Sequence, residues 1–351
     1  MKKRIVGLMS GTSLDGLDIC YVEFDTASWK DYKLLAFETV EYDEVWHTIL
    51  KEAYSYSANK LAQTDADLGK YFGKQVNKFI KKNGINKIDL IASHGQTIFH
   101  NPLQGYTTQI GHGSYINTIT QIKTISDFRY QDVALGGEGA PLVPMGDLLL
   151  FPEYTYCLNL GGFANISIKK NASIKAFDIC PVNIVLNHYA QKEGLKYDKG
   201  GKLASKGKIN RRLLKELNDL PEYEASVPKS FGWEMVEQKI LPLIDSYKLD
   251  ISDILRTYVE HVAIQISRKV KKGRMLVTGG GAFNNFLMDR INNYSPAEII
   301  VPGEKLINYK EALIFALLGL LKDLDKINIL AEVTGAQIDH SSGVVYDAFS
   351  G

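Results

Sequence analysis

The stretch IVGLMSGTSLDGLD, Ile5 to Asp18, decides how the beginning of this chain folds. An apolar run typical of a buried strand passes directly into nine residues that hold two glycines, three hydroxyl side chains and two carboxylates. The alternating segment DICYVEFDT, Asp18 to Thr26, predicts a returning strand, so the glycine-rich segment becomes a hairpin turn. A turn that only reversed the chain would need fewer polar groups.

The composition bounds the class of protein. The chain has 351 residues, with 41 basic and 40 acidic side chains. This length predicts two domains, and the charge balance gives no reason to expect nucleic acid or an anionic membrane as a partner. Three scattered cysteines argue against a disulfide framework and a structural zinc site. We expect a cytoplasmic protein, because no segment has the ~20 apolar residues of a membrane span and the first apolar run is too short for a signal peptide.

Two later segments repeat the opening pattern. YTYCLNLGGFANISI, Tyr154 to Ile168, predicts a strand, a Gly-Gly turn and a second strand. RMLVTGGGAFNNFLMDRI, Arg274 to Ile291, predicts a strand, a triple-glycine turn and a helix. Glycine turns at strand ends can bring backbone N–H groups close to a phosphate, and a helix N-terminus adds a favourable dipole. Two similar halves with a cleft between them are therefore the economical architecture.

Periodicity predicts the other elements. Strands are expected at 33–42, 88–95, 108–111, 123–128 and 173–180, and helices at 43–83, 182–194, 251–272 and 310–322.

Each candidate motif has a second interpretation. Gly11, Thr12, Ser13, Asp15 and Gly16 fit a phosphate-binding turn whose carboxylate holds Mg²⁺, but they also fit an ordinary polar hairpin. The turn is not a Walker A loop, because it has no lysine. The glycines of the third turn, 279–281, fit a flat ligand such as adenosine lying on bare backbone, or a tight connection.

The candidate polar residues are equally open. His94 and Gln96, at a strand end, face a ligand or cap the next turn. Arg129 either pairs with Asp127, two residues earlier on one strand face, or donates to a substrate carboxylate. Asp178 is either a helix N-cap or a general base. The remaining candidate, Glu311, fits the polar face at the start of a helix.

Taken together, the motifs resemble those of the anhydro-N-acetylmuramic acid kinases, in the actin-like ATPase superfamily. They run in order from residue 7 to residue 336: GLMSGTSLDGLD, SHGQT, DFR, GGEGAPLVP, LNLGGFANIS, AFD with Pro181 and Asn183, YDKGG, PKSFG, VTGGGAFNN, YKEALIFA and EVTGA. The resemblance implies an α/β fold of two actin-like (ribonuclease H-like) domains, each a mixed five-stranded sheet flanked by helices, with an interdomain cleft. On this basis we assign 1–130 plus about 333–351 to the first domain and 131–332 to the second.

The resemblance also implies an activity. ATP and Mg²⁺ would be used to open 1,6-anhydro-N-acetylmuramic acid by hydrolysis and to phosphorylate its O6, giving N-acetylmuramic acid 6-phosphate and ADP in peptidoglycan recycling. Asp178 would deprotonate the water that attacks C1. The O6 released from C1 would attack the γ-phosphorus, so one carboxylate suffices where ordinary glycosidases use two. The family resemblance suggests a homodimer.

Site residues follow from the matched motifs. For the sugar the resemblance implies His94, Gln96, Arg129 and Glu311, with Arg129 on the lactyl carboxylate, and for the metal it implies Asp15. For ATP it implies Gly11, Thr12, Ser13, Leu14, Asp15, Gly16, Leu17, Asp18, Gly161, Gly162, Asn165, Gly279, Gly280 and Gly281.

Two departures from the family pattern keep alternatives open. Met9 stands where related sugar kinases have an Asp, so other groups must hold Mg²⁺. After Asp178 the family's Asp-Thr-Gly-Pro-Gly-Asn is replaced by Asp-Ile-Cys-Pro-Val-Asn, which can narrow the sugar pocket. A kinase for another small sugar is therefore an alternative. A nucleotide-binding regulator without catalysis is a second alternative, which applies if Asp178 points into the core rather than the cleft.

Overall fold

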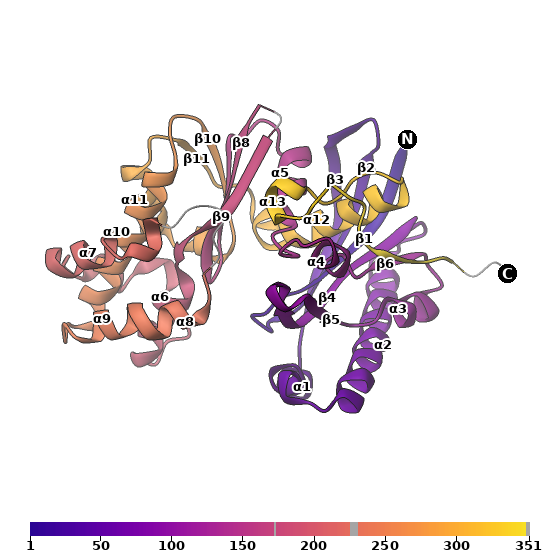
Figure 1. The fold of residues 1–351 in the computed structure, drawn as a ribbon, viewed down its shortest axis with the longest axis horizontal. Helices are drawn as coiled ribbons and strands as arrows, with labels where there is room; N and C mark the ends of the chain where they lie inside the picture. The colour runs from indigo at the N-terminus through magenta and orange to yellow at the C-terminus, as the bar shows by residue number, and fades with distance from the viewer. Residues whose placement is uncertain (172, 225–230, 349–351) are drawn as a thin grey trace. The chain divides into compact units, whose positions relative to one another are not determined.

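The computed structural model describes residues 1–171, 173–224 and 231–348. The chain divides into two compact units: Met1–Pro152 with Tyr309–Gly351, called unit 1, and Glu153–Asn308, called unit 2. Figure 1 shows the two ends of the chain, indigo and yellow, in the same unit. The predicted domains change over near residues 130 and 332 instead, and that division stays a prediction; its last residues, 349–351, lie outside the described residues.

Unit 1 is built on a seven-stranded sheet in the order β12-β6-β4-β1-β2-β3, with β5 paired to β4. The predicted hairpin is confirmed: β1 and β2 are antiparallel, and Ser10 pairs with Leu17 across the turn. The strands are β1 (Lys2–Ser10), β2 (Gly16–Asp25), β3 (Ser28–Glu41), β4 (Leu90–Asn101), β5 (Tyr106–Ile110), β6 (Thr124–Ser126) and β12 (Val344–Tyr346).

Helices cover both faces of this sheet (Figure 1). On one face Val6 and Leu8 of β1 share a core with Phe72 of α2. The residue between them, Gly7, faces the other way, and a Cβ there would lie 2.0 Å from the carbonyl oxygen of Ala312. Glycine therefore lets α12 lie directly on β1. The helices are α1 (Glu44–Glu52), α2 (Ala58–Asn83), α3 (Gly113–Thr120), α4 (Tyr130–Ala134), α5 (Val143–Leu150), α12 (Glu304–Asp323) and α13 (Ala331–Thr334), with 3-10 turns at Ala53–Ser55 and Pro102–Gln104.

The helical pattern predicted over 43–83 is divided between two helices, α1 and α2. The chain leaves the helical conformation at Tyr56, and the side chain of Ser57 accepts a hydrogen bond from the N–H of Lys60. Because this cap starts a new helix, the segment forms α1 and α2 rather than one rod.

Unit 2 is built on a five-stranded sheet in the order β11-β10-β7-β8-β9. Its strands are β7 (Tyr156–Leu160), β8 (Phe163–Lys170), β9 (Ser173–Pro181), β10 (Arg274–Thr278) and β11 (Glu298–Ile300). Its helices are α6 (Asn183–Lys192), α7 (Arg211–Asn218), α8 (Trp233–Met235), a π-helical turn at Val236–Ile240, α9 (Leu241–Asp245), α10 (Ile251–Lys269) and α11 (Asn285–Tyr294), with 3-10 turns at Lys199–Gly201, Ala204–Lys206, Pro221–Glu224 and Gly280–Phe283.

The two sheets repeat one topology. Without β5 and β12, unit 1 has the order β6-β4-β1-β2-β3, which matches β11-β10-β7-β8-β9 strand for strand. In both, the first two strand pairs are parallel and the last two antiparallel. The expected α/β fold with mixed sheets is therefore present. The expectation of five strands in each sheet is corrected for unit 1, where β5 folds back along β4 and β12 pairs with the free side of β6.

In the described part of the chain, no helix is both long enough and apolar enough to cross a bilayer.

Candidate active site

The first glycine turn joins β1 to β2 in unit 1. Leu14 has a φ of 57° and donates its N–H to the carbonyl oxygen of Gly11 at 3.2 Å. A Cβ at Gly11 would have one atom within 4 Å, Ser13 Oγ at 3.7 Å, so space is open beside this backbone. The exposed residues of the turn are Thr12, Ser13 and Asp15. The turn thus presents hydroxyls, a carboxylate and accessible backbone.

Two further residues of the predicted nucleotide turn serve the packing of unit 1. A Cβ at Gly16 would lie 2.5 Å from the carbonyl oxygen of Val40, so glycine is needed where β2 meets β3. Leu17 is fully buried in the core. Gly16 and Leu17 can therefore contact a ligand only through their backbone atoms.

Asp18, on β2, is a half-buried carboxylate. Thr39 Oγ1 donates to its Oδ1 at 2.6 Å. Burial raises the pKa of Asp18 to about 6, and the negative charges of Glu311 and Asp15 add to the rise, while the Thr39 hydrogen bond opposes it. Asp18 on β2 therefore lies close enough to Asp15 of the first turn and to Glu311 of α12 for both charges to act on it.

The second and third glycine turns abut each other in unit 2. The second turn, Gly161–Gly162, joins β7 to β8, and Gly162 O accepts the N–H of Val182 at 2.7 Å. In the third turn Gly279 has a φ of 84°, and a Cβ there would lie 2.8 Å from the carbonyl oxygen of Leu160. A Cβ at Gly281 would lie 2.7 Å from Leu160 Cβ. Both turns therefore depend on close backbone contact around Leu160.

Asn183 links the second turn to the third. Its Nδ2 donates to Leu160 O at 3.1 Å, and it is the nearest atom to a Cβ built on Gly280, at 4.0 Å. The carboxamide of Asn159 lies beside Gly279 in the same way, because a Cβ there would come within 2.5 Å of Asn159 Oδ1. Asn159 was not predicted as a site residue, although it directly precedes the LGG turn.

Asp178 lies on β9 opposite Asn165 of β8. Asn165 Nδ2 donates a hydrogen bond to Asp178 Oδ1. The N–H of Phe231 donates to Asp178 Oδ2 at 2.9 Å. Asp178 is half-buried. Phe231 belongs to the PKSFG motif, of which 228–230 lie outside the described residues. The N-cap interpretation of Asp178 is wrong, because α6 begins at Asn183 with no side-chain cap.

The departures from the family pattern after Asp178 lie in the core of unit 2. Ile179, Cys180 and Val182 are all 0% exposed and belong to one apolar cluster with the helices behind the sheet. The side chains that replace a hydroxyl and two glycines therefore fill the interior of unit 2.

In unit 1, Arg129 joins His94. Arg129 Nε donates to His94 Nε2 at 2.8 Å, and Arg129 Nη1 donates to the carbonyl oxygen of Gly139 at 2.6 Å. Because an arginine Nε can only donate, His94 Nε2 is an acceptor and Nδ1 carries the proton given to Gly95 O at 2.9 Å. Burial holds the pKa of His94 well below its ordinary value, and the charge of Arg129 lowers it further. His94 is therefore neutral.

Gln96 is buried in the middle of β4, which continues to Asn101, so the strand end predicted at His94 and Gln96 is wrong. Gln96 pairs with Ser10 of β1, next to the first turn. Ser10 Oγ donates to Gln96 Oε1 at 2.5 Å and shares a 2.6 Å hydrogen bond with the hydroxyl of Tyr42. Ser10 and Tyr42 were not predicted as site residues. Their sequence signal is weak, since Ser10 reads as the last residue of a strand and Tyr42 as the end of another.

Glu311, on α12, is half-buried in unit 1. Burial raises its pKa, and the positive charges of Lys310 and Arg129 oppose the rise. Burial lowers the pKa of Arg129 to about 10, against the effects of Glu311 and Asp132. The neighbouring Lys310 forms a buried ion pair with Asp147, 2.7 Å between Nζ and Oδ1. Unit 1 thus places an arginine, a carboxyl group and a neutral histidine in one cluster.

A cavity of about 120 Å³ lies beside the middle of β4 and the end of β6. It is lined by His94 and Gly95 and by polar residues that include Asp65, His112, Asp127 and Tyr346. Asp127 has a φ of 58°, which ends the strand before it, so the predicted face shared by Asp127 and Arg129 does not form. Among the described residues the salt bridge between them is absent, and Arg129 is bound to His94 and Gly139 instead.

Comparison with known proteins places this chain clearly. The family model described as anhydro-N-acetylmuramic acid kinase matches residues 3–348. Curated proteins of that name are similar over nearly their whole length: 34% identity in Vibrio parahaemolyticus, covering 97% of this chain and 97% of the relative, 34% in Saccharophagus degradans, covering 97% and 98%, and 36% in a Shewanella species, covering 95% and 96%.

The solved structures that are similar to this chain have much lower sequence identity. The activator of 2-hydroxyisocaproyl-CoA dehydratase from Clostridium difficile, with bound ADPNP, has a TM-score of 0.45 at 15% identity, covering 92% of this chain and 97% of that chain. A ROK family glucokinase from Streptomyces griseus, in complex with glucose and AMPPNP, has a TM-score of 0.41 at 11% identity, covering 90% and 98%.

Proposed function

The chain belongs to the anhydro-N-acetylmuramic acid kinase family, and from this membership we propose the reaction and the residues that perform it. The substrates are 1,6-anhydro-N-acetylmuramic acid, ATP and water, and the products are N-acetylmuramic acid 6-phosphate and ADP, in cell-wall recycling. The observation that carries this proposal is the family match over residues 3–348. Both units act on the same ligands, and this joint action is part of the proposal.

The three glycine turns bind ATP. The support is open space beside backbone at Gly11, Gly162 and Gly280, where an added Cβ would meet no atom closer than 3.7 Å. Backbone N–H groups there can approach phosphate oxygens or the nucleoside without a side chain between. The ATP residues proposed are those of the first turn, Gly11, Thr12, Ser13, Leu14, Asp15, Gly16, Leu17 and Asp18, and of unit 2, Gly161, Gly162, Asn165, Gly279, Gly280 and Gly281.

Asp15 and Asp18 would hold Mg²⁺ together with phosphate oxygens and water. Among the described residues, no three His, Cys, Asp or Glu side chains gather as a complete metal site. Mg²⁺ does not need one, because it binds through one or two carboxylates plus phosphates. Asp15 is exposed, and it lies close enough to Asp18 to raise the pKa of that carboxyl. The ion supplies charge neutralisation on the phosphates.

The sugar lies against His94, Gln96, Arg129 and Glu311. Arg129 has its Nε and Nη1 committed to protein acceptors, and within the described part of the chain Nη2 makes no hydrogen bond to protein. A guanidinium held on one edge can offer its other donors to a planar anion. We assign these donors to the lactyl carboxylate of the substrate.

Asp178 is the general base. Hydrogen bonds from Asn165 and from the N–H of Phe231 orient its carboxylate. Asp178 takes a proton from water as the water oxygen bonds to C1 of the sugar, and the C1–O6 bond breaks with its electron pair on O6. This oxygen then attacks the γ-phosphorus and ADP leaves. No separate acid is needed for O6, since its charge passes to the phosphoryl group.

We also propose that the enzyme works as a homodimer in the cytoplasm; the support is the family resemblance. Light scattering of the purified protein would test the oligomeric state.

The reaction is tested with purified protein, ATP and Mg²⁺, followed by mass spectrometry of the products. 1,6-Anhydro-N-acetylmuramic acid should be consumed with stoichiometric ADP, while N-acetylmuramic acid and glucose should react at least about 100-fold more slowly. Equal turnover of glucose would support the alternative of a kinase for another sugar. Nucleotide binding without any product would support the alternative of a non-catalytic regulator.

A further inference from the structure

The guanidinium of Arg129 is held by acceptors on two different segments. His94 Nε2 accepts from Nε at 2.8 Å, and Gly139 O accepts from Nη1 at 2.6 Å. An arginine side chain loses considerable rotamer freedom when it is fixed in this way, so the acceptors decide where its free donors lie.

Gly139 is itself fixed by a buried carboxylate. Its N–H donates to Asp132 Oδ2 at 2.7 Å, while its carbonyl oxygen accepts from Arg129. Gly139 has a φ of +64°, and a Cβ there would lie 2.8 Å from Val133 Cγ2. This conformation suits glycine, and it lets one residue connect Asp132 to Arg129.

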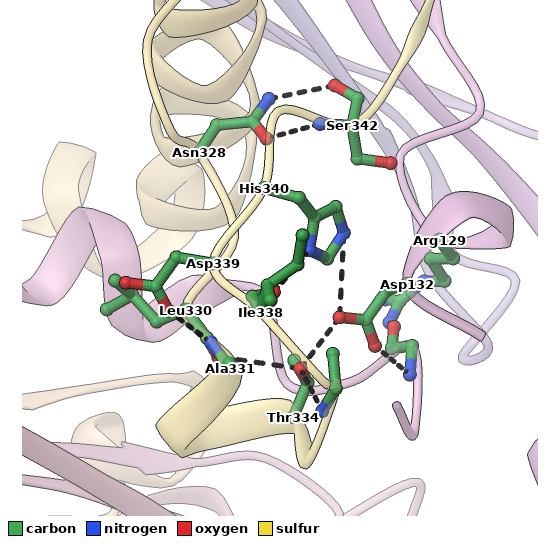
Figure 2. Close-up of polar contacts among 12 residues, drawn as sticks. Arg129, Asp132, Asn328, Leu330, Ala331, Thr334, Ile338, Asp339, His340 and Ser342 are labelled. Carbon is green, nitrogen blue, oxygen red and sulfur yellow. Dashed lines mark hydrogen bonds and ion pairs between the residues drawn. The ribbon is translucent and has the colours of Figure 1, made fainter. Parts of the chain in front are cut away.

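Asp132 is fully buried on α4, and the C-terminal segment supplies its second partner. Thr334 Oγ1 donates to Asp132 Oδ1 at 2.7 Å. His340 Nε2 lies 3.7 Å from the same oxygen, while His340 Nδ1 bonds to Ile338 O at 3.1 Å. Figure 2 shows Thr334 and His340 converging on Asp132 from the segment that follows α12.

The C-terminal segment is anchored well enough to hold Asp132. Asn328 is 0% exposed and donates to the carbonyl oxygen of Leu318. It also donates to the carbonyl oxygen of Ser342 and accepts the N–H of Ser342 at 2.7 Å (Figure 2). Thr334 also accepts, through its carbonyl oxygen, the N–H of Glu138 at 2.7 Å. The segment therefore ties the end of α12 to the loop that contains Gly139.

We propose that Asp132, fixed by Thr334, is a positioning residue that sets Arg129 for recognition of the substrate carboxylate. Asp132 touches neither the ligand nor the reacting atoms. It fixes Gly139, and Gly139 O fixes the guanidinium. The inference rests on the proposed function, because it takes the lactyl carboxylate of the sugar as the group that Arg129 binds.

The test compares two ligands by isothermal titration calorimetry with the full-length protein. 1,6-Anhydro-N-acetylmuramic acid carries the lactyl carboxylate, and 1,6-anhydro-N-acetylglucosamine has the same bicyclic ring without it. Thr334→Val removes the hydroxyl at nearly constant volume, and Thr334→Ser restores it. Asp132→Asn presents an amide in place of one carboxylate oxygen. Thr124→Val is the control, since it removes a buried hydroxyl of unit 1 that donates to Ile122 O at 3.0 Å.

We expect Thr334→Val and Asp132→Asn to weaken binding of the carboxylate ligand by about 10- to 100-fold, the range for a charged hydrogen bond. Binding of the second ligand and of ATP should change less than about twofold. Thr334→Ser should recover most of the loss, and Thr124→Val should lower the melting temperature without changing the ratio of the two affinities.

Two results would overturn the inference: equal loss for both ligands, which is general damage, or no loss for either. If Asp132→Asn does not fold, the comparison of Thr334→Val with Thr334→Ser still tests the inference. A wild-type protein that binds neither sugar refutes the proposed function instead. A wild-type protein that binds both sugars equally refutes the role of Arg129, and the inference with it.

Discussion

Asn165 and Asp178 face each other across the β8–β9 pair, and the Asn165 amide donates a hydrogen bond to the Asp178 carboxylate. Asn165 follows the second glycine turn by three residues. The proposed general base is thus coupled to the strand that leaves a proposed phosphate-binding turn. A second donor, the N–H of Phe231, fixes the other carboxylate oxygen at 2.9 Å.

Replacing Asp178 tests the assignment of the base. Asp178→Asn removes the proton acceptor but keeps the size of the side chain, so the rate of product formation should fall by about 10³-fold or more. ATP affinity, measured by calorimetry, should stay within about twofold. Asp253→Asn is the matched control, because Asp253 is also a half-buried acceptor of a backbone N–H in unit 2, at 2.6 Å from Lys208 N. Retained turnover in Asp178→Asn would remove Asp178 from the mechanism.

The ionised Asp18 carboxylate should lower the free energy of unfolding while it serves the proposed Mg²⁺ site. Its pKa in the folded protein is about 6, above the ordinary 3.8, so the folded state binds this proton more tightly than the unfolded chain does. The associated stabilisation is complete below pH 3.8 and is lost as the pH rises to about 6. Asp18→Asn never ionises and still accepts from Thr39. At pH 8 its free energy of unfolding should exceed the wild-type value by about 1–2 kcal/mol, after allowance for partial exposure.

The same variant should lose at least about tenfold in kinase activity, because a proposed Mg²⁺ ligand is missing. Denaturant unfolding at pH 8 and at lower pH checks the sign, since the gain should shrink as the pH falls below 6. Asp25→Asn is a control in which the change in stability should have the opposite sign. The Ala27 N–H lowers the pKa of Asp25, so this variant should be less stable than wild type at pH 8. A destabilised Asp18→Asn would contradict the account.

The third glycine turn offers a test that separates folding from binding. A Cβ at Gly280 would have only Asn183 Nδ2 within 4 Å, at 4.0 Å. Gly280→Ala should therefore keep its melting temperature within about 2 °C. If ATP lies on this backbone, its dissociation constant should rise by about tenfold or more. Gly303→Ala, in the same unit, adds a methyl group with nothing within 4 Å, and it should bind ATP normally. Unchanged ATP affinity in Gly280→Ala would exclude adenosine from this turn.

Local patterns predicted the parts of the fold that local interactions decide. The hairpin at residues 10–17, the Gly-Gly turn after β7 and the strand before the triple glycine all form. A strand followed by glycine and polar residues has few alternatives, because glycine ends the strand and permits the turn. The repeated topology of the two sheets follows the repeat seen in the sequence.

Features that depend on distant contacts were not predictable from patterns. Asp132 and Thr334 are 202 residues apart, and each looks like an ordinary residue of a short helix. The alternation along Asp127 and Arg129 suggested a shared strand face, but the left-handed φ of Asp127 ends the strand there. A strand was predicted at 108–111 and forms as part of β5, but its pairing with β4 was not predicted. The strand β12 was not predicted, because a short strand gains its stability from its partner. The GGEGAP and EVTGA segments were noted only as motifs of the family, and their sequences do not indicate that Glu138 and Thr334 are in contact.

The most direct test of the central claim is mass spectrometry of the product formed in water enriched in heavy oxygen. If Asp178 activates water at C1, one heavy oxygen should appear at the anomeric position of N-acetylmuramic acid 6-phosphate and none in the phosphoryl group. Label in the phosphoryl group, or a product without label once anomeric exchange is controlled for, would contradict the proposed ring opening.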